Sequence, residues 1–550
     1  MSVELHFNSV VTAAARGDSL FTCAEKLGIP VPTSCNKQGK CKECVVEVAE
    51  GMECLSPPGP AERHLKGSFR LSCCARLAAE EGIVRCHTMR RGAMKIEKHA
   101  FALPTGARSW QLDPAVTRDG DRILLDGVEI DRGAGPLHGL AIDLGTTTVV
   151  MRLLDLETGE VVADSSFENP QRFGGSDVMA RIQYDTEDRT RALQRTLTGY
   201  LGRAIREFPV DPRSIYEVII AGNSTMRDLF FRLSVYSIGQ SPYRSLTELE
   251  IAEGKRTTTS LSDTARRLGL PIHPKARIHG LPIISGHVGA DAAACMLAVD
   301  LAHEERLVAV MDIGTNTELI VGNRHKVLAA SCPAGPAFEG GQISCGMPGL
   351  PGAIEKVALH DDGRVETRVI GDLPPEGLCG SGLVDLLAEL RRTGRMNALG
   401  RFEDGAHEFL VAAGGDRPVT FNEADINALA QAKGANVAGL QIAFAEYGID
   451  YAQLDTFYLA GGFGRHLDLG SAKRIGLIPN LPAEKIVQVG NASVEGACIA
   501  LLSRAKRAEL EALVKRVQHC RLETHPGFFD YFVEGCQFAP VGGGATVSGG

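Results

Sequence analysis

The sequence has few aromatic residues and no long hydrophobic run. Phe, Trp and Tyr together make up 5% of the 550 residues, and there is one tryptophan. No apolar stretch reaches the roughly 20 residues that a helix needs to cross a bilayer. Glycine, in contrast, is frequent at 62 residues. Many tight turns and few aromatics favour α/β domains over a β-sandwich, and the length predicts about three or four domains.

The chain also lacks a positive net charge and a secretion signal. Its 58 basic and 67 acidic residues give a formal net charge of −9, which argues against nucleic acid as a partner. The start, "MSVELHFNSVVTAAARGD", has neither the basic nor the apolar region of a signal peptide. Fifteen cysteines, an odd number in a long chain, argue against a disulfide scaffold. We therefore expect a soluble, cytoplasmic protein with reduced thiols and no membrane partner.

The N-terminal part predicts a compact unit of strands around one helix. Residues 3–14 are typical of a hairpin, and "GDSLFTCAEKLGI" predicts a short helix that Asp18 caps and Gly28 ends. "CVVEVAEG" predicts a β-branched strand, and residues 82–89 predict a closing strand. Such a unit would end near residue 90.

The rest of the chain contains the same order of strand, turn and strand twice. "GLAIDLGTTTVVMRLLDLETGEVV" (139–162) runs from an apolar strand through a Gly/Thr turn into a second strand, and residues 307–331 repeat this order. Two copies predict a duplicated lobe. Residues 423–448 and 503–520 predict helices. We expect a domain over residues 1–90, a linker with a small hairpin or helix over 91–137, lobes over 138–300 and 301–542, and a flexible tail over 543–550.

Three cysteines lie within ten residues of one another in "SCNKQGKCKECVVEV". Cys35, Cys41 and Cys44 have the spacing C-x5-C-x2-C, and Cys73 in "FRLSCCARL" is the best candidate for a fourth ligand. Four thiolates in this arrangement resemble a ferredoxin that binds a 2Fe-2S cluster, in which three ligands are clustered and one is remote. The first gap is one residue longer than the plant-type spacing, as in the adrenodoxin branch.

A structural zinc site and unrelated buried thiols are the alternatives to a cluster that stay open from the sequence. A structural zinc site usually has two C-x2-C pairs, whereas only one pair here has that spacing. Cys74 is adjacent to Cys73 and competes with it as the fourth ligand. Cys23, Cys54 and Cys86 have the character of small apolar core residues.

The two repeated turns have the residues of a phosphate-binding site. Glycine allows close approach of the backbone, and successive N–H groups and hydroxyls can hold phosphate oxygens. An aspartate beside such a turn can hold Mg²⁺, often through water. Neither turn matches the P-loop pattern. The candidates are Asp143, Gly145, Thr146, Thr147 and Thr148 in the first turn, and Asp312, Gly314, Thr315, Asn316 and Thr317 in the second.

A third glycine-rich segment follows an apolar strand in "FYLAGGFGRHLD". Together with the two turns it resembles the duplicated, ribonuclease H-like ATPase lobes of actin, Hsp70 and the acetate and sugar kinases. That resemblance implies that Gly461, Gly462, Phe463 and Gly464 contact adenosine. It also implies an α/β multidomain fold, with a β-grasp ferredoxin domain (α+β) in front of the ATPase lobes.

The order of these modules and several phrases resemble one family closely. The phrases are "NPQRFGGSDVMARI" (169–182), "AGNSTM" (221–226), "GHVGAD" (286–291), "CPAGPAFEGGQISCGMPG" (332–349), "GLCGSGLVD" (377–385), "LAGGFG" (459–464) and "IGLIP" (475–479). From residue 3 to about residue 540, the chain resembles the reductive activators of corrinoid-dependent methyltransferases, called RACE proteins.

This resemblance implies an ATP-hydrolysing iron–sulfur reductase. It would return one electron from its 2Fe-2S cluster to the inactive Co(II) corrinoid of a methyltransferase's corrinoid protein, which regenerates Co(I). The implied cofactors are the cluster, ATP and Mg²⁺, with Asp143 and Asp312 organising Mg²⁺. The implied partners are the corrinoid protein, a low-potential electron donor and a second copy of the chain in a homodimer.

Other functions fit parts of the pattern. Activators of radical or dehydratase enzymes also join actin-like ATPases to iron–sulfur centres, although their cluster usually bridges two subunits. A chaperone-like switch ATPase could use the cluster as a redox sensor. A kinase fits less well, because no acceptor-substrate base stands out beyond the phosphate-site aspartates.

Overall fold

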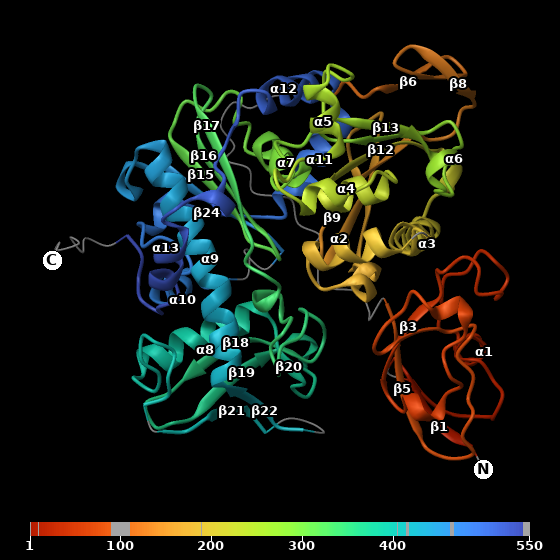
Figure 1. Cartoon of the computed structure of the whole chain (residues 1–550). Coiled ribbons are helices and arrows are strands. Elements are labelled where there is room, and N and C mark those ends of the chain that lie inside the picture. Colours follow the sequence, from red (N-terminus) through yellow and green to blue (C-terminus); the bar gives the residue numbers. More distant parts are fainter. Residues whose placement is uncertain are drawn as a thin grey trace. The chain divides into compact units, whose positions relative to one another are not determined.

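The structure is a computed structural model that describes residues 2–8, 10–89, 111–188, 190–403, 405–413, 417–462 and 467–542. These residues form two compact units (Figure 1). The first unit holds the described residues up to position 89 and Leu112–Leu281, and the second holds those from Pro282 onward. The predicted tail, most of the predicted linker's first half, and Phe463 and Gly464 lie outside the described residues.

The first unit begins with a small mixed sheet of β-grasp type, with strands in the order β2-β1-β5-β3-β4. Strands β1 and β5 are parallel, and the other neighbours are antiparallel. Side chains of β1 alternate between core and surface, and Cys23, Cys54 and Cys86 pack in this core as predicted. The elements are β1 (Val3–Phe7), β2 (Val10–Ala14), α1 (Leu20–Lys26), β3 (Val45–Glu50), β4 (Phe69–Leu71) and β5 (Ile83–Thr88).

The cap of helix α1 differs from the prediction. Ser19, not Asp18, is the N-cap, because its hydroxyl accepts the N–H of Thr22 at 3.1 Å. Asp18 instead forms an ion pair with Lys26 at 2.7 Å. Both residue types cap helices well, so only the backbone geometry decides between neighbours.

The first unit continues with a three-stranded antiparallel sheet, β6-β7-β8, and then the six-stranded sheet β11-β10-β9-β12-β14-β13 of the first lobe. The small sheet lies where the linker predicted a hairpin or helix. Strands β9 and β12 are buried over nearly their whole length. The strands are β6 (Val116–Asp119), β7 (Arg122–Leu125), β8 (Val128–Arg132), β9 (His138–Leu144), β10 (Thr148–Asp155), β11 (Val161–Glu168), β12 (Ile215–Gly222), β13 (Leu261–Thr264) and β14 (Arg277–Gly280).

Helices of the first lobe cover this sheet and connect its strands (Figure 1). A short 3-10 helix, η3 (Pro170–Gly174), follows β11 and precedes the first of them. The α-helices are α2 (Val178–Glu187), α3 (Ala192–Glu207), α4 (Ser224–Phe230), α5 (Leu246–Ala252) and α6 (Ala265–Leu268).

The second unit repeats the topology of the first lobe. Its sheet has the order β24-β23-β15-β16-β17-β25, and β15 pairs antiparallel with β16 and parallel with β23, as β9 does with β10 and β12. This correspondence confirms the predicted duplication. The strands are β15 (Val308–Asp312), β16 (Thr317–Gly322), β17 (Val327–Cys332), β23 (Thr456–Ala460), β24 (Ile486–Gly490) and β25 (Gln518–His519).

An insertion between β17 and β23 adds two small sheets and two helices to the second lobe. Asn422 is the N-cap of the long helix α9, and its side chain forms a capping box with Asp425. The predicted helix over 503–520 is shorter, because its last residues form β25 beside β17. The remaining elements are α7 (Ala290–Ala298), β18 (Ala353–Leu359), β19 (Val365–Val369), β20 (Gly377–Leu378), α8 (Gly380–Arg392), β21 (Glu408–Ala412), β22 (Val419–Asn422), α9 (Glu423–Tyr447), α10 (Leu469–Arg474), α11 (Ala492–Leu502), α12 (Arg504–Val514) and α13 (Phe528–Gly535).

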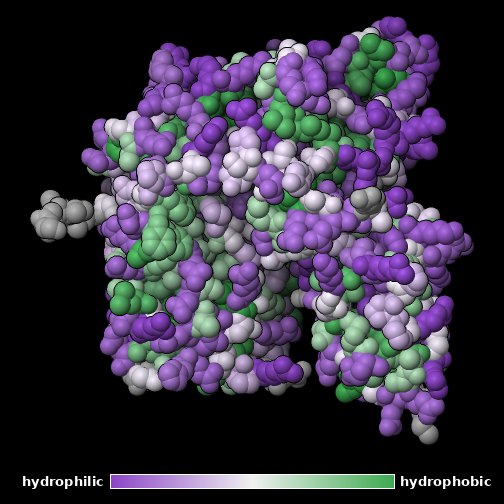
Figure 2. Space-filling view, viewed as in Figure 1, coloured by the Kyte–Doolittle hydropathy of each residue, from purple (hydrophilic) through white to green (hydrophobic). Residues whose placement is uncertain are grey.

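The surface is mainly hydrophilic, with local hydrophobic areas (Figure 2). One such area lies over α13, where Phe529 and Val533 are exposed. Among the described residues, no helix combines the length and the apolar character that crossing a bilayer requires.

Candidate functional site

The four predicted cysteines lie on two segments of the β-grasp module. Cys35, Cys41 and Cys44 come from the loop between α1 and β3, and Cys73 follows β4. The Sγ atoms of Cys44 and Cys73 are 3.3 Å apart, and Cys41 lies close enough to Cys35 to lower the pKa of its thiol. A 2Fe-2S cluster takes two thiolates on each iron, so this pairing fits its ligand set.

The backbone of the cysteine loop points donors at the sulfurs. Residues 36, 37, 39 and 42 have left-handed conformations, which turn the loop tightly. Burial disfavours the Cys35 thiolate, but N–H groups of Cys41, Lys40 and Gln38 outweigh that effect and lower its pKa to about 7. The Gly39 N–H likewise reaches Cys73. Such N–H groups stabilise the negative sulfurs of an iron–sulfur cluster, so the residues present fit the group.

Gly39 is required at its position in this loop. Its φ is +67°, and a Cβ atom there would lie 2.9 Å from Cys74 Sγ and 3.1 Å from Ala61 Cβ. Cys74 Sγ is 3.8 Å from Cys73 Sγ, and burial followed by the Cys73 charge raises the pKa of Cys74 to about 12. The sulfur of Cys73 lies 3.3 Å from that of Cys44, which favours Cys73 over Cys74 as the fourth ligand.

A buried ion pair lies next to the residue that the cysteine loop contacts, Ala61. Arg70 donates to both carboxylate oxygens of Glu62 at 2.8 and 3.1 Å, and both side chains are 2% exposed. Glu62 also accepts the Leu71 N–H at 3.0 Å. The ammonium of Lys42 donates to the Ala61 carbonyl at 2.5 Å. These bonds connect both the cysteine loop and β4 to the segment around Ala61 and Glu62.

The first predicted phosphate turn, Gly145–Thr148, lies between β9 and β10 in the first unit. A Cβ atom on Gly145 would lie 2.5 Å from the Thr148 carbonyl oxygen, so the turn requires glycine there. Asn223 donates to Thr146 Oγ1 at 2.9 Å. Asp143 is half-buried at the end of β9, beside the turn, as predicted.

The second turn occupies the same place in the second unit, between β15 and β16. Thr315 Oγ1 donates to Glu339 at 2.5 Å, and the Gly335 N–H donates to the Thr315 carbonyl at 2.8 Å. Thr317 is fully buried in β16 rather than exposed in the turn. Asp312 ends β15 and accepts a hydrogen bond from Cys295 at 3.2 Å.

Gly461 brings the third glycine-rich segment against the second turn. Its φ is +109°, and a Cβ atom there would lie 2.3 Å from the carbonyl oxygen of Ile313. Ile313 in turn donates its N–H to Ala460 at 3.1 Å. Gly462 is open, with nothing near its Cβ position. The structure therefore joins two of the predicted adenine-nucleotide segments within the second unit.

Three acidic residues around the second turn were not singled out from the sequence. Burial raises the pKa of Glu318 well above its usual value, and the charges of Asp291 and Asp312 add to this. Glu339 binds Thr315. Asp291 lies in "GHVGAD" and Glu318 in "TNTEL", so their places in these two motifs could have identified both residues. Carboxylates gathered beside a phosphate turn can hold Mg²⁺ directly or through water.

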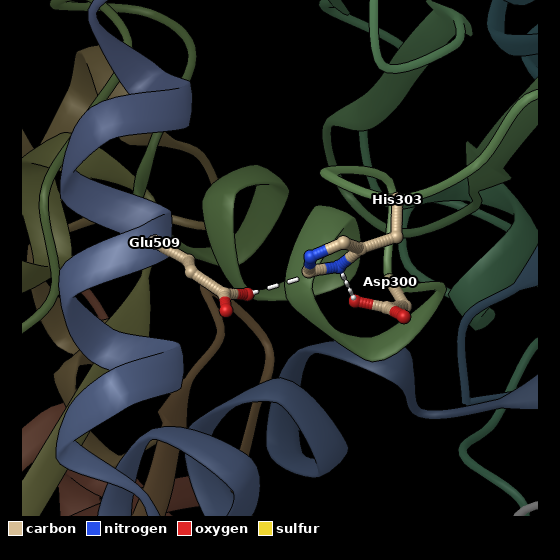
Figure 3. A group of neighbouring side chains, drawn as sticks. All are labelled: Asp300, His303 and Glu509. Carbon is tan, nitrogen blue, oxygen red and sulfur yellow. Dashed lines mark hydrogen bonds and ion pairs between the residues drawn. The ribbon is translucent and has the colours of Figure 1, made fainter. Parts of the chain in front are cut away.

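A separate group of possible ligands lies elsewhere in the second unit. Figure 3 shows Asp300 and His303 facing Glu509 of α12, with His303 Nδ1 3.0 Å from Asp300 and 3.8 Å from Glu509. Lys506 Nζ is 3.1 Å from Asp300 and 2.8 Å from Glu509. The lysine already supplies the positive charge between the carboxylates, so this group carries no metal assignment.

Three family models match consecutive parts of the chain. The "2Fe-2S iron-sulfur cluster binding domain" matches residues 6–78. The "RACo middle region" matches residues 138–304, and the "C-terminal domain of RACo the ASKHA domain" matches residues 306–543.

Curated relatives and a solved structure match most of the chain. "Corrinoid activation enzyme RamQ" of Eubacterium limosum is 31% identical over 447 residues, which cover 76% of this chain and 73% of that protein. The "Co(II) methylated amine-specific corrinoid protein" reductase of Methanosarcina barkeri is 24% identical over 420 residues, covering 72% and 76%. A solved structure of a "Reductive activator for corrinoid,iron-sulfur protein" has 26% identity and a TM-score of 0.72, covering 98% of both chains.

Proposed function

The chain belongs to the family of corrinoid reductive activators, and from this premise we propose its reaction. Using ATP, it transfers one electron to the inactive Co(II) corrinoid of a methyltransferase's corrinoid protein, which regenerates Co(I). The observation that carries this function is that one chain combines four cysteines, on two neighbouring segments of a β-grasp module, with two lobes of duplicated topology. Matches to a 2Fe-2S domain and to the RACo regions cover the same modules.

In this proposal the cysteines hold the redox group. Cys35, Cys41, Cys44 and Cys73 would hold the cluster, with Cys44 and Cys73 close enough to share one iron and Cys35 and Cys41 as the other pair. A bound 2Fe-2S cluster supplies one-electron transfer. The loop's N–H groups stabilise the negative charge on the sulfurs, and burial of Cys44 keeps water from that side.

The two turns hold the phosphates of ATP in this proposal. N–H groups and hydroxyls of residues 145–148 and 314–316 bind phosphate oxygens, and Asp143 and Asp312 organise Mg²⁺. Thr317, which is fully buried, anchors the end of the second turn in β16. Residues 461–464 contact the adenosine. The proximity of Gly461 to Ile313 supports this assignment, because it brings the third segment to the second turn.

ATP is needed because the reduction is energetically uphill. A plant-type cluster has a potential of about −400 mV, and we expect the Co(II)/Co(I) couple to be more negative. Each 59 mV or so of deficit costs a factor of ten in a one-electron equilibrium. We propose that ATP stabilises a state of the lobes that binds the corrinoid protein in a more easily reduced ligation, and that hydrolysis releases it. Such coupling requires different affinities for two states.

The electron donor, the oligomeric state and the cellular compartment are also part of the proposal. A low-potential reductant supplies the electron, and the protein works as a homodimer in the cytoplasm. The odd number of cysteines, all of them free thiols, supports an intracellular, reducing setting.

The test is an anaerobic assay with a Co(II) corrinoid protein, a low-potential reductant and Mg²⁺–ATP, followed by visible spectroscopy. We expect Co(I) to form only when ATP is present. ADP in place of ATP is the matched control. Equal reduction with ATP and ADP, or no reduction with either, would contradict the proposal. ATP-dependent binding without reduction would instead favour the switch-ATPase alternative.

A further inference from the structure

One asparagine forms hydrogen bonds with the backbone of the first phosphate turn. Asn169 donates its side-chain amide to the Gly145 carbonyl at 2.8 Å and its backbone N–H to the Thr147 carbonyl at 2.6 Å. Its side-chain oxygen accepts the Gln171 N–H at 2.9 Å, which caps η3. Asn169 is 1% exposed, so these bonds are shielded from water. Asn169 therefore connects the turn directly to the start of η3.

Arg172 and Phe173 of η3 contact the N-terminal β-grasp module that carries the four cysteines, called the iron–sulfur module below. Arg172 forms an ion pair with Glu47 of β3 at 2.6 Å and a second one with Glu168 at 3.3 Å. The next side chain, Phe173, meets Phe69 edge-to-face with ring centroids 6.5 Å apart. Asn169, which holds the phosphate turn, and Arg172, which contacts Glu47, are only three positions apart in the sequence.

Helix α3 provides a second connection to the cysteine loop itself. Gln171 donates to the Leu193 carbonyl in the first turn of α3 at 3.3 Å. One turn later, Thr196 Oγ1 donates to the Lys42 carbonyl at 2.9 Å. Lys42 lies between Cys41 and Cys44, so this hydrogen bond fixes the backbone that carries two predicted ligands.

The segment is too tightly packed to shift on its own. A Cβ atom on Gly174 would lie 2.6 Å from a Leu193 methyl, and one on Gly175 would lie 2.3 Å from Ala180 Cβ. Cys44 and Cys73 belong to the same buried apolar cluster as Phe173. Packing of this density favours discrete movements of whole elements over gradual deformation.

From these contacts we propose that residues 169–175 couple the phosphate turn to the iron–sulfur module, with Arg172 as the positioning residue. Nucleotide at Gly145–Thr148 changes how Asn169 holds η3, and Arg172 and Phe173 pass that change to β3 and β4. The orientation of the module then depends on the nucleotide. This inference rests on the proposed function, because the purpose of the coupling is to present the module for electron transfer in one nucleotide state.

The direct test is hydrogen–deuterium exchange of the cluster-loaded protein with and without Mg²⁺–ATP, ADP and a non-hydrolysable ATP analogue. In the wild type we expect nucleotide to change exchange in peptides covering residues 40–48 and 64–71. We expect Arg172→Gln to retain cluster absorbance and nucleotide affinity but to lose this response. The acceleration of Co(II) reduction by ATP should also fall, by about 2- to 30-fold, the range typical of coupling through packed networks.

Two further variants separate coupling from simple destabilisation. Arg152→Gln is the matched control, because Arg152 forms a similarly shielded ion pair with Asp164 at 2.8 Å within the first lobe's sheet. We expect it to keep the exchange response. Glu47→Gln should reproduce Arg172→Gln, and the double variant should be no worse than either single one, because both remove the same contact.

The outcomes distinguish this inference from the proposed function. If wild-type protein binds nucleotide but peptides 40–48 and 64–71 do not respond, the coupling is wrong even if Co(II) is reduced. An unchanged response in Arg172→Gln also overturns it. If the response is present and depends on Arg172 while Co(I) never forms, the coupling holds and the proposed function fails.

Discussion

The sulfur atoms of Cys44 and Cys73 lie 3.3 Å apart, although 29 positions separate the two residues in the sequence. Two thiolates this close repel each other, and the contact with Cys44, together with burial, raises the pKa of Cys73. A bound iron would reverse this effect, since a metal ion deprotonates the thiols that coordinate it.

The first prediction separates the two candidates for the fourth ligand. Cys73→Ser should lose the visible absorbance of the 2Fe-2S cluster after anaerobic reconstitution, because one iron loses its thiolate. Cys74→Ser, its matched neighbour, should retain the spectrum. Cys41→Ser should abolish reduction yet leave nucleotide affinity within about twofold of the wild type, because the ligands belong to a different module. Loss of the cluster in Cys74→Ser alone would reverse the assignment.

A second prediction concerns the contact between Gly461 and Ile313. Gly461→Ala should weaken ATP binding in titration calorimetry, because the new methyl group meets the backbone of the second phosphate turn. Gly448→Ala is the control, since Gly448 also has a positive φ, +87°, but has open space at its Cβ position. Both variants carry backbone strain of about 1–3 kcal/mol. Equal ATP affinity in the two variants would show that the turn does not need Gly461.

The buried ion pair between Glu62 and Arg70 predicts an acid-sensitive iron–sulfur module. Burial alone would raise the pKa of Glu62, but hydrogen bonds from Arg70 and from backbone N–H groups lower it below its usual value. Its contribution to folding is therefore complete above the unfolded-state pKa of about 4.3 and is lost as the pH falls through the lower folded-state pKa.

Glu62→Gln measures that contribution. Removing one partner of a buried pair costs about 3–5 kcal/mol of unfolding free energy, so denaturant unfolding at pH 7 should show a large loss. Glu80→Gln is the control, because Glu80 pairs with Arg16 on the surface of the same module at 3.2 Å, with both side chains about two-thirds exposed. The ion pair would have no special role if both variants unfolded at the same denaturant concentration.

A fourth prediction links Mg²⁺ binding to pH. Burial, followed by the neighbouring carboxylates of Asp291 and Asp312, raises the pKa of Glu318 well above its usual value, which favours its protonated form. A divalent cation favours the ionised form, so binding of Mg²⁺–ATP should release a proton and tighten as the pH rises, by up to about tenfold per pH unit. Calorimetry in buffers of different ionisation enthalpy counts the proton. Glu318→Gln should remove the release, and an unchanged release would identify another group.

Short sequence patterns correctly predicted the main elements of the fold. The hairpin at residues 3–14, the cysteine loop and the two copies of strand, turn and strand each depend on short stretches of sequence. What could not be predicted depends on the tertiary structure. Asp291 and Glu318 influence each other only because α7 and β16 come together, and the end of the predicted helix near residue 520 becomes β25 through pairing with β17. The same holds for Arg172, whose partner Glu47 lies in another module.

The central claim is that one electron held on the N-terminal cysteines reaches a Co(II) corrinoid only with the help of ATP. The most direct measurement is a single turnover: the reduced protein, freed of external reductant, is mixed with a Co(II) corrinoid protein and Mg²⁺–ATP, and both chromophores are followed. The account predicts one Co(I) formed for each cluster oxidised, and neither change with ADP. Cluster oxidation without Co(I), or Co(I) formed at the same rate without ATP, would contradict it.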